Sequence, residues 1–487
     1  MIKPPNGLSM TEHGTRPLVP MLLEGVFAPG RGASFRLTDP VSGAARWDVP
    51  HATISELDLA VASAHNAWLA WSKRPWRERQ LVMCNVLHLI RQKSESLVQT
   101  LATETGRTLQ DCRTEVQTGM DHLLSAINPV NPGMTAQGGK IHTHSLGVCL
   151  IVTPVCFPVL FALATFPLAL VSGNTCIIKP SEFTPVSIVK LGEMLIEAGV
   201  PAGVVQIVHG RSSEVAALID HPDVRAVSSA GSSSSAFAIQ QRAAKHGKRF
   251  QCLASTHNHV VIMPDAPVDQ VMQDLTTSTC LKAGHNCMAW SSALLVGKAS
   301  DLLDDLVDLF EEINVGPPSK SISRCGPLAA TQYWEQGLDA IQEAIEEGAI
   351  GLVDGRDSHV AGFEDGYWIG PTLFSSVQTD MRLYREDLPG PILGCMHVDD
   401  LQEAINIINA QPNILVSSMY TLQPGLARQF SENIQCGLIT INKPLFYPAP
   451  QSCHFAWKKT FFGDIPPFGP HAMDFYMQYQ TVLEQWS

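Results

Sequence analysis

Short apolar runs alternate with helical stripes through the middle of the chain. Val148–Thr153 and Thr175–Ile178 are β-branched runs typical of buried strands. The first is followed by a helical stretch, Val159–Val171, and the second by a helix that begins at Pro185 and ends before Gly199. Repeated strand–helix units predict a parallel sheet covered by helices, so we expect an α/β fold.

The alternation continues in two further segments. Up to residue 253 it predicts a helix near Glu214–Ile219 between the strands Val204–Val208 and Val224–Ser228. A second α/β unit begins near Ala254. Its predicted elements are the strands Val260–Met263, Trp290–Val296 and Ile392–Met396 and the helices Leu302–Ile313 and Tyr333–Gly348.

The N-terminal part and two outlying segments follow other patterns. Residues 1–50 resemble a hairpin, a capping-box-like start at Ser55 predicts a helix, and Trp76–Gln92 and Ser94–Thr105 continue in helical style. Residues 128–144 are turn-rich, which predicts a protruding hairpin or linker. Residues 475–486 alternate like an edge strand, which needs a partner. An inter-subunit sheet would supply one, so we expect a homodimer or homotetramer.

Composition narrows the classes of function. The 487 residues are 45% hydrophobic and carry a net charge of −13, which argues against nucleic acid or an anionic membrane as the main partner. The most apolar tract, Leu146–Val171, contains three prolines, and we interpret it as a buried strand and helix rather than a membrane span. Twelve cysteines form no C-x-x-C pair, and we expect a cytoplasmic protein without a metal site.

Two stretches carry candidate chemistry. Cys287 lies in the glycine-containing turn 283–289, just before the predicted strand Trp290–Val296, as expected of a catalytic nucleophile. A buried structural cysteine is the alternative. The run from Gly231 to Ser235 lies between a strand and a helix, where backbone N–H groups can bind a cofactor diphosphate; a flexible serine loop is the alternative.

Four landmarks, in the right order, resemble motifs of the aldehyde dehydrogenase superfamily. They are Thr153-Pro154-Val155-Cys156-Phe157-Pro158 for P-x-N-F-P, Lys179-Pro180-Ser181-Glu182 for K-P-S-E, Gly231-Ser232 for a cofactor-facing G-S turn, and Gly284-His285-Asn286-Cys287 for G-Q-x-C. Residues 246–251, 258–266 and 287–289 further resemble the CoA-acylating methylmalonate-semialdehyde dehydrogenase branch.

The resemblance implies a Rossmann-type NAD domain (residues 1–127 and 147–253), an α/β catalytic domain (254–469) and a β-strand oligomerisation arm (128–146 and 470–487). It also implies roles for single residues: Cys287 as nucleophile, Lys179 and Glu182 at the adenosine ribose, Gly231 and Ser232 at the diphosphate, and Asp387 at the nicotinamide ribose. Because Glu182 would repel a 2′-phosphate, NAD is favoured over NADP. A surface salt bridge is the alternative for Lys179 and Glu182.

Several positions depart from the family pattern. Cys156, a weak S–H donor, replaces the oxyanion asparagine, and Leu253 replaces the glutamate that activates water in hydrolytic members. Asn286 and Thr118 stand where the methylmalonate-semialdehyde branch has arginines, so a carboxylate-bearing substrate loses its partners. Loss of the glutamate suits release of the acyl group to CoA, because a thiol can supply its own thiolate.

Two further departures concern the cofactor loop and the nucleophile turn. The family's E-x-F-G-P becomes residues 387–391, with Asp387 one methylene shorter than glutamate, Pro389 in place of the aromatic ring, and Glu386 as a competing carboxylate. His285 replaces the usual glutamine. Two interpretations stay open: the imidazole titrates near neutral pH and helps to ionise Cys287, or it is a hydrogen-bonded structural histidine.

The sequence therefore predicts NAD-dependent oxidation of a small-molecule aldehyde through a cysteine thiohemiacetal and thioester, with CoA as the acyl acceptor. Two alternatives stay open. One is a catalytically impaired paralogue with a structural, regulatory or aldehyde-capturing role, and the other is a hydrolytic aldehyde dehydrogenase.

Overall fold

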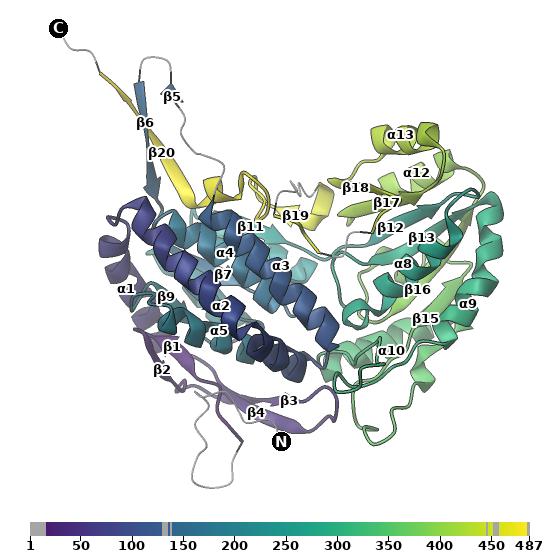
Figure 1. Ribbon diagram of the computed structural model, residues 1–487, viewed down its shortest axis with the longest axis horizontal. Helices are drawn as coiled ribbons and strands as arrows, with labels where there is room; N and C mark the ends of the chain where they lie inside the picture. The colour runs from purple at the N-terminus through teal and green to yellow at the C-terminus, as the bar shows by residue number, and fades with distance from the viewer. Residues whose placement is uncertain (1–15, 129–134, 137–138, 445–446, 451–456, 485–487) are drawn as a thin grey trace.

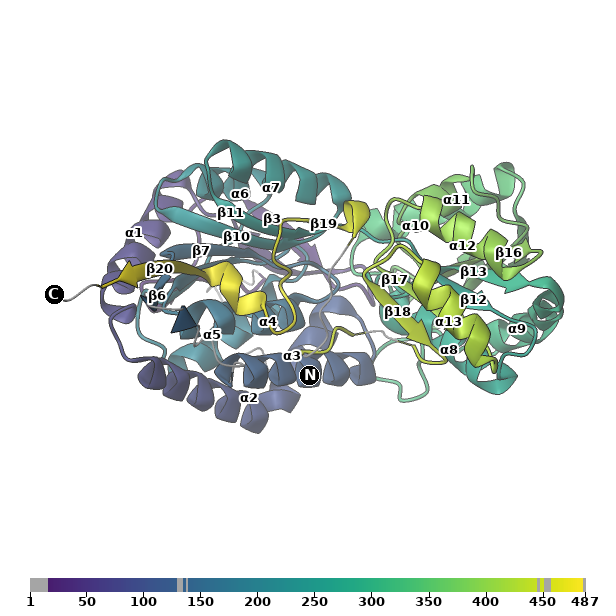
Figure 2. The same cartoon turned by 90° about the horizontal axis from the view of Figure 1, so that it is seen from above.

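The computed structural model describes residues 16–128, 135–136, 139–444, 447–450 and 457–484. It consists of two α/β halves, each built on its own sheet, and a narrow β-arm that projects from the first half (Figure 1). Seen from above, the halves lie side by side with β19 (Phe461–Phe462) near their junction (Figure 2). The predicted α/β class is confirmed.

The first half contains an eight-stranded sheet with the order β19-β11-β10-β7-β8-β9-β1-β2. The five central strands are parallel, and the pairs at both edges are antiparallel. The remaining bounds are β1 Met21–Leu23, β2 Val26–Ala28, β7 Val148–Val152, β8 Thr175–Lys179, β9 Val205–Ile207, β10 Val224–Ala230 and β11 Arg249–Leu253. β19 lies within residues 254–469 yet pairs with β11, so the chain returns to the first half after the second sheet is complete.

Helices cover this sheet on both faces. They are α1 Ile54–Trp71, α2 Trp76–Thr105, α3 Leu109–Ile127, α4 Pro158–Val171, α5 Pro185–Glu197, α6 Ser212–Asp220 and α7 Ser233–Lys245. α4 is buried almost all round, which explains the apolar tract at residues 146–171: the tract forms strand β7 and helix α4. Among the described residues, no helix is long and apolar enough to cross a membrane.

One local prediction about the N-terminal helices is wrong. α1 is capped by Thr53 rather than started at Ser55: the Thr53 hydroxyl accepts from the Glu56 N–H, and the Glu56 carboxylate accepts from the Thr53 N–H at 2.8 Å. The helical stretches predicted at Trp76–Gln92 and Ser94–Thr105 are confirmed, and they join into one helix, α2, which packs against α3 and α5.

The second half contains a seven-stranded sheet with the order β14-β15-β16-β13-β12-β17-β18, in which all pairs except β14–β15 are parallel. Its strands are β12 Asn258–Ile262, β13 Trp290–Val296, β14 Ile350–Val353, β15 Thr372–Ser375, β16 Ile392–Val398, β17 Val416–Tyr420 and β18 Leu438–Ile441. Its helices are α8 Val268–Cys280, α9 Leu303–Glu311, α10 Thr331–Glu346, α11 Arg382–Arg385, α12 Leu401–Ala410 and α13 Pro424–Asn433.

Two smaller sheets complete the fold. β3 (Ser34–Thr38) pairs with β4 (Ala45–Pro50), in agreement with an N-terminal hairpin. The arm consists of β5 (Thr135–Ala136), β6 (Gly139–Ser145) and β20 (Met477–Leu483), all antiparallel. The predicted edge strand at 475–486 begins too early, because Phe475 and Tyr476 belong to a buried 3₁₀ turn; residues 485–487 lie outside the described residues. β20 pairs with β6 of its own chain.

Candidate active site

A cavity of about 1070 Å³ is lined by all eight site residues predicted from the sequence. They are Cys156, Lys179, Glu182, Gly231, Ser232, His285, Cys287 and Asp387. The first five follow strands β7, β8 and β10 of the eight-stranded sheet, and the last three come from loops of the second half. The cavity therefore joins the carboxyl ends of parallel strands, where α/β proteins bind ligands, to the predicted nucleophile.

Lys179 and Glu182 lie at one end of this cavity but do not have the same environment. Burial lowers the pKa of Lys179 to about 8, although the nearby Glu182 and Glu214 oppose the shift. Glu182 has an ion-pair partner in Arg211, with 3.6 Å between Oε1 and Nε. Glu182 therefore takes part in a salt bridge, as the alternative supposed, whereas Lys179 is only 5% exposed and lines the cavity.

The turn at Gly231 and Ser232 is shaped to hold an anion. Ser232 caps α7, and its hydroxyl accepts from the Ser235 N–H at 3.3 Å. A Cβ at Gly231 would meet nothing nearer than the Ser235 Cβ at 3.9 Å, so the backbone is open to an approaching ligand. Thr153 also lines the cavity, and its buried hydroxyl has no hydrogen-bond partner among the described residues. These donors and the positive end of α7 fit the diphosphate of a dinucleotide.

The nucleophile turn is fixed by hydrogen bonds from β12 and its approach. The Cys287 carbonyl accepts from the Thr256 hydroxyl at 2.6 Å and from the Asn258 amide at 2.9 Å. Gly284 has a φ of 75°, and any side chain there would overlap the carbonyl oxygen of Gly390. The turn is therefore held against the 387–391 loop, and Cys287 is partly exposed to the cavity.

Cys156 and Cys287 face each other as a pair of thiols. Their side chains share a hydrogen bond, which lowers the pKa of Cys156 and raises the pKa of Cys287. Burial raises both pKa values, and the Lys282 ammonium lowers both. The pair therefore loses its first proton more readily than its second, as expected when two acids share one proton.

A buried ionic cluster that the sequence reasoning missed supports this pair. Arg107 donates to Glu115 at 2.7 Å and to the Cys156 carbonyl at 3.0 Å. The other Glu115 oxygen accepts from the N–H groups of Val159 and Leu160 at the start of α4, at 3.1 and 3.2 Å. The cluster thus ties α3 to the segment that carries Cys156.

Lys282 completes the cluster from the nucleophile turn. Its Nζ is 3.9 Å from Glu115 and lies over the rings of Phe157 and Tyr447, and it has no hydrogen-bond partner among the described residues. Burial lowers the pKa of Lys282 to about 8. A lysine two residues before the motif glycine was a visible signal in the sequence, but the distance between residues 107, 115 and 282 along the chain concealed their contact.

His285 is correctly placed in the cavity, but its predicted titration near neutral pH is wrong. Burial, Arg107 and Lys282 lower its pKa to about 4, so the imidazole is neutral at pH 7 and a weak base. Its ring packs edge-on against Tyr333 of α10, with 4.6 Å between centroids. This environment favours the structural alternative.

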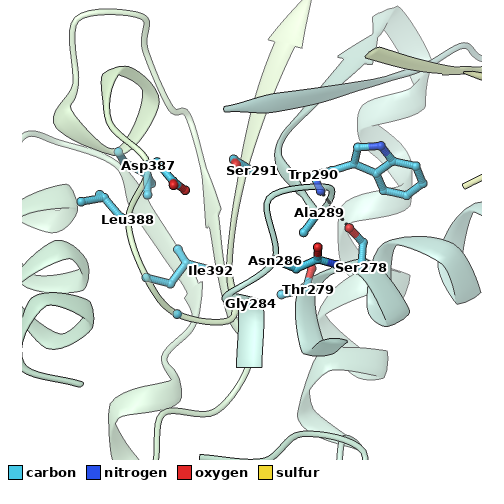
Figure 3. Close-up of a pocket in the computed structure, with 12 residues that line it drawn as sticks. Ser278, Thr279, Gly284, Asn286, Ala289, Trp290, Ser291, Asp387, Leu388 and Ile392 are labelled. Atoms are coloured by element: carbon cyan, nitrogen blue, oxygen red, sulfur yellow. Dashed lines mark hydrogen bonds between the residues drawn. The ribbon is translucent and has the colours of Figure 1, made fainter. Parts of the chain in front are cut away.

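Asp387, rather than Glu386, faces the cavity. Burial raises the pKa of Asp387 to about 6, opposed by hydrogen bonds from Ser255 and Thr256. Glu386 points outward and pairs with Arg382 at 2.8 Å. A hollow of about 20 Å³ lies beside the nucleophile turn. Asp387 and Asn286 line it from opposite sides (Figure 3).

Of the positions that depart from the family pattern, some line the cavity and one does not. Leu253, Asn286 and Pro389 line the cavity. Thr118 is not among the described residues that line it, and its hydroxyl donates to the Thr114 carbonyl of the same helix at 2.8 Å.

Comparison with known proteins agrees with this geometry. Residues 27–482 match the family model described as "Aldehyde dehydrogenase family". A mitochondrial methylmalonate-semialdehyde dehydrogenase [acylating] of Arabidopsis thaliana is 36% identical over 489 residues, covering 98% of this chain and 80% of the plant protein. Its human counterpart, named methylmalonate-semialdehyde/malonate-semialdehyde dehydrogenase, is 32% identical over 96% of this chain and 90% of its own length.

Solved structures extend the match to the fold. The crystal structure of methylmalonate-semialdehyde dehydrogenase from Oceanimonas doudoroffii has a TM-score of 0.92 and 31% identity, covering 96% of this chain and 98% of that one. The family resemblance, the branch and the fold predicted from the motifs are confirmed. The chain belongs to the aldehyde dehydrogenase family.

Proposed function

We propose that this protein is an NAD-dependent aldehyde dehydrogenase that transfers the acyl group to CoA. The observation that carries the proposal is the single cavity that joins Lys179, Glu182 and the Gly231–Ser232 turn to Cys287. The relatives named as acylating semialdehyde dehydrogenases support it. So does a Sinorhizobium meliloti protein solved in complex with NAD, which has a TM-score of 0.93, 29% identity and coverage of 98% of this chain and 99% of that one.

Because both thiols line the cavity, each can take part in the first step of the reaction. Cys287 attacks the aldehyde carbon, a C–S bond forms, and its proton passes to Cys156 through their hydrogen bond. The developing oxyanion is then held by the Cys156 S–H and the backbone N–H of Cys287. NAD, when bound, supplies the hydride acceptor that converts the thiohemiacetal to a thioester, and Asp387 would orient its nicotinamide ribose.

The acyl acceptor is inferred from the residue at position 253, beside the site of the thioester. Leu253 ends β11 at the cavity and has no group that can take a proton from water. The thiolate of CoA attacks the thioester carbon, the bond to Cys287 breaks, and the acyl group leaves as acyl-CoA. An incoming thiol needs no carboxylate base at this position, and water does.

The walls around Cys287 favour an uncharged aldehyde. Phe157, Leu160, Phe161, Leu415 and Phe468 line the cavity. Asn286 has replaced a guanidinium, and the cations Arg107 and Lys282 are not among the described residues that line it. A carboxylate-bearing semialdehyde would lose its bidentate partners here and have to be desolvated against apolar walls.

The two halves and the arm suggest a division of roles. We assign NAD binding to the eight-stranded sheet (1–127 and 147–253), catalysis to residues 254–469, and subunit pairing to the arm (128–146 and 470–487). A second copy would add to the arm in a homodimer or homotetramer. The cytoplasmic location stays a prediction; the plant and human relatives are named as mitochondrial.

The test is NADH formation over a panel of apolar and carboxylate-bearing aldehydes, with and without CoA, and with Cys287→Ala as the blank. The proposal expects CoA-dependent turnover that is faster with the apolar aldehydes. Equal rates with and without CoA would favour the hydrolytic alternative. NAD binding without turnover would favour the impaired paralogue, which the replacements at Cys156, Leu253, Asn286 and Pro389 also suggest. No NAD binding at millimolar concentration would reject all dehydrogenase functions.

A further inference from the structure

Cys156 and Cys287 differ from the other cysteines in where they lie. Of the eleven described cysteines, eight are buried, Cys84 is exposed, and Cys156 and Cys287 are partly exposed. Both of these line the same cavity, and their side chains share a hydrogen bond. They are therefore the described pair of thiols that are close together and also open to a small solute.

The surroundings favour a thiolate on this pair. Cys156 lies immediately before Phe157, the N-cap of the fourteen-residue helix α4, where the helix dipole stabilises negative charge. The Lys282 ammonium, 3% exposed and without a hydrogen-bond partner among the described residues, lies against Phe157. Arg107 donates to the Cys156 carbonyl. A low-pKa, accessible thiol beside a second thiol is the arrangement most readily oxidised to a disulfide.

We propose that Cys156 and Cys287 form a reversible disulfide when the protein meets a hydroperoxide, so that the active site is also a redox modification site. The Cys156 thiolate attacks one oxygen of hydrogen peroxide, the O–O bond breaks, and a sulfenic acid and hydroxide result. The Cys287 sulfur then attacks the sulfenic sulfur, the S–S bond forms, and the sulfenic oxygen leaves as water with the Cys287 proton. In sum, two thiols are oxidised and one peroxide is reduced to two waters.

The disulfide has two consequences. It removes the nucleophile, so any activity that depends on Cys287 stops until a thiol reductant restores it. It also keeps Cys287 from passing beyond sulfenic acid to the irreversible sulfinic and sulfonic states. Neither consequence requires the proposed dehydrogenase reaction, because the bond forms between residues of the resting protein.

The experiment is peptide mapping by mass spectrometry of the full-length protein after treatment with hydrogen peroxide and alkylation of free thiols. Trypsin releases Cys287 in a peptide from Ala283 to Lys298 that contains no other cysteine. We expect this peptide to be linked to the one that contains Cys156, with a loss of about 2 Da from the summed masses, and to be released by dithiothreitol. A second protease separates Cys156 from Cys149 and Cys176, which share its tryptic peptide.

Two variants, each with one cysteine replaced, test whether the link depends on Cys156. Cys156→Ser should lose the link, and its Cys287 should accumulate sulfinic acid that dithiothreitol does not reverse. Cys84→Ser, at an exposed position on α2, should keep the link. A wild-type protein with sulfinic Cys287 and no link, or a link from Cys287 to Cys149 or Cys176, would overturn the proposal. Because the readout is mass, absence of dehydrogenase activity would leave the test intact, and absence of the link would leave the dehydrogenase proposal intact.

Discussion

The two ends of the cavity have diverged to different extents from the family pattern. At the cofactor end, Lys179, Glu182, Gly231 and Ser232 all keep the residue types of the family motifs. At the catalytic end, Cys287 is kept, but its neighbours Cys156, Leu253, His285 and Asn286 are replaced. The contrast indicates that the motif residues assigned to the adenosine ribose and the diphosphate have been kept, whereas the residues assigned to the oxyanion and to release of the acyl group have changed.

The two ends also differ in how their charged side chains are paired: the ion pairs near the catalytic end are buried, and the ion pair of Glu182 at the cofactor end is partly exposed. Arg107, Glu115 and Lys282 are buried together beneath the thiol pair, whereas Glu182 pairs with the half-exposed Arg211. Removing the partner of a buried charge lowers the free energy of unfolding strongly, whereas removing the partner of an exposed charge changes it little. Substitutions should therefore affect stability mainly at the catalytic end and affinity for the cofactor mainly at the other.

Cys287→Ala should give the largest effect. Removing the sulfur removes the covalent step, so NADH formation should fall by about 10⁴-fold or more. Binding of NAD, measured by calorimetry, should stay within about twofold, because the cofactor residues lie at the other end. Substantial NADH formation by this variant would break the comparison by showing that Cys287 is not the nucleophile.

Glu115→Gln should destabilise the fold. The change leaves Arg107 and Lys282 without their anion, and a buried pair broken in this way costs about 3–5 kcal/mol. Chemical denaturation followed by circular dichroism measures the loss. Glu95→Gln, which breaks an exposed pair with Arg113, is the matched control and should have a much smaller effect. Equal losses in the two variants would show that the buried cluster has no special role.

Cys156→Asn tests the altered oxyanion contact. An amide N–H is a stronger donor than a thiol, but an amide cannot take the proton of Cys287, so the kcat for NADH formation should fall by about tenfold or more. The KM for NAD should not change. A rise in kcat would instead mean that contact with the oxyanion limits the rate and that the Cys156 thiol is not needed as the proton acceptor for Cys287.

Glu182→Gln tests the cofactor end. Loss of the carboxylate removes an acceptor for a ribose hydroxyl and the repulsion of a 2′-phosphate, so the KM for NAD should rise about tenfold and the preference over NADP should shrink. Initial rates with both cofactors measure this. An unchanged ratio of the two kcat/KM values would mean that Glu182 serves only its ion pair with Arg211.

The smallest expected effect is the pH dependence of NAD binding. The pKa of Lys179 is about 8, so its ammonium is present at pH 7 and largely lost at pH 9. The KM for NAD should therefore rise by about two- to threefold over this range. Lys179→Met should have a weaker but pH-independent affinity, and a wild-type profile in that variant would assign the titration to another group.

The strand and helix periods predicted most of the α/β core, and four short motifs predicted which residues line the cavity. The errors were local or electrostatic. The cap of α1 lies at Thr53, two residues before Ser55, because Thr53 and Glu56 form the two reciprocal hydrogen bonds of a capping box. The imidazole of His285 is neutral because burial, Arg107 and Lys282 lower its pKa. Neither its burial nor its proximity to Arg107 can be read from the turn that contains it.

By itself, the sequence determined the family, the parallel sheets, the candidate nucleophile and the residues that replace the family's usual side chains around it, because these depend on residue type, spacing and order along the chain. Only the tertiary structure showed that Cys156 and Cys287 share a hydrogen bond and that Arg107, Glu115 and Lys282 form one buried cluster beside them. The reason is physical. Contacts and pKa values depend on distances in space, and folding alone brings Cys156 to Cys287, 131 residues further along the chain, and Glu115 to Lys282, 167 residues further along.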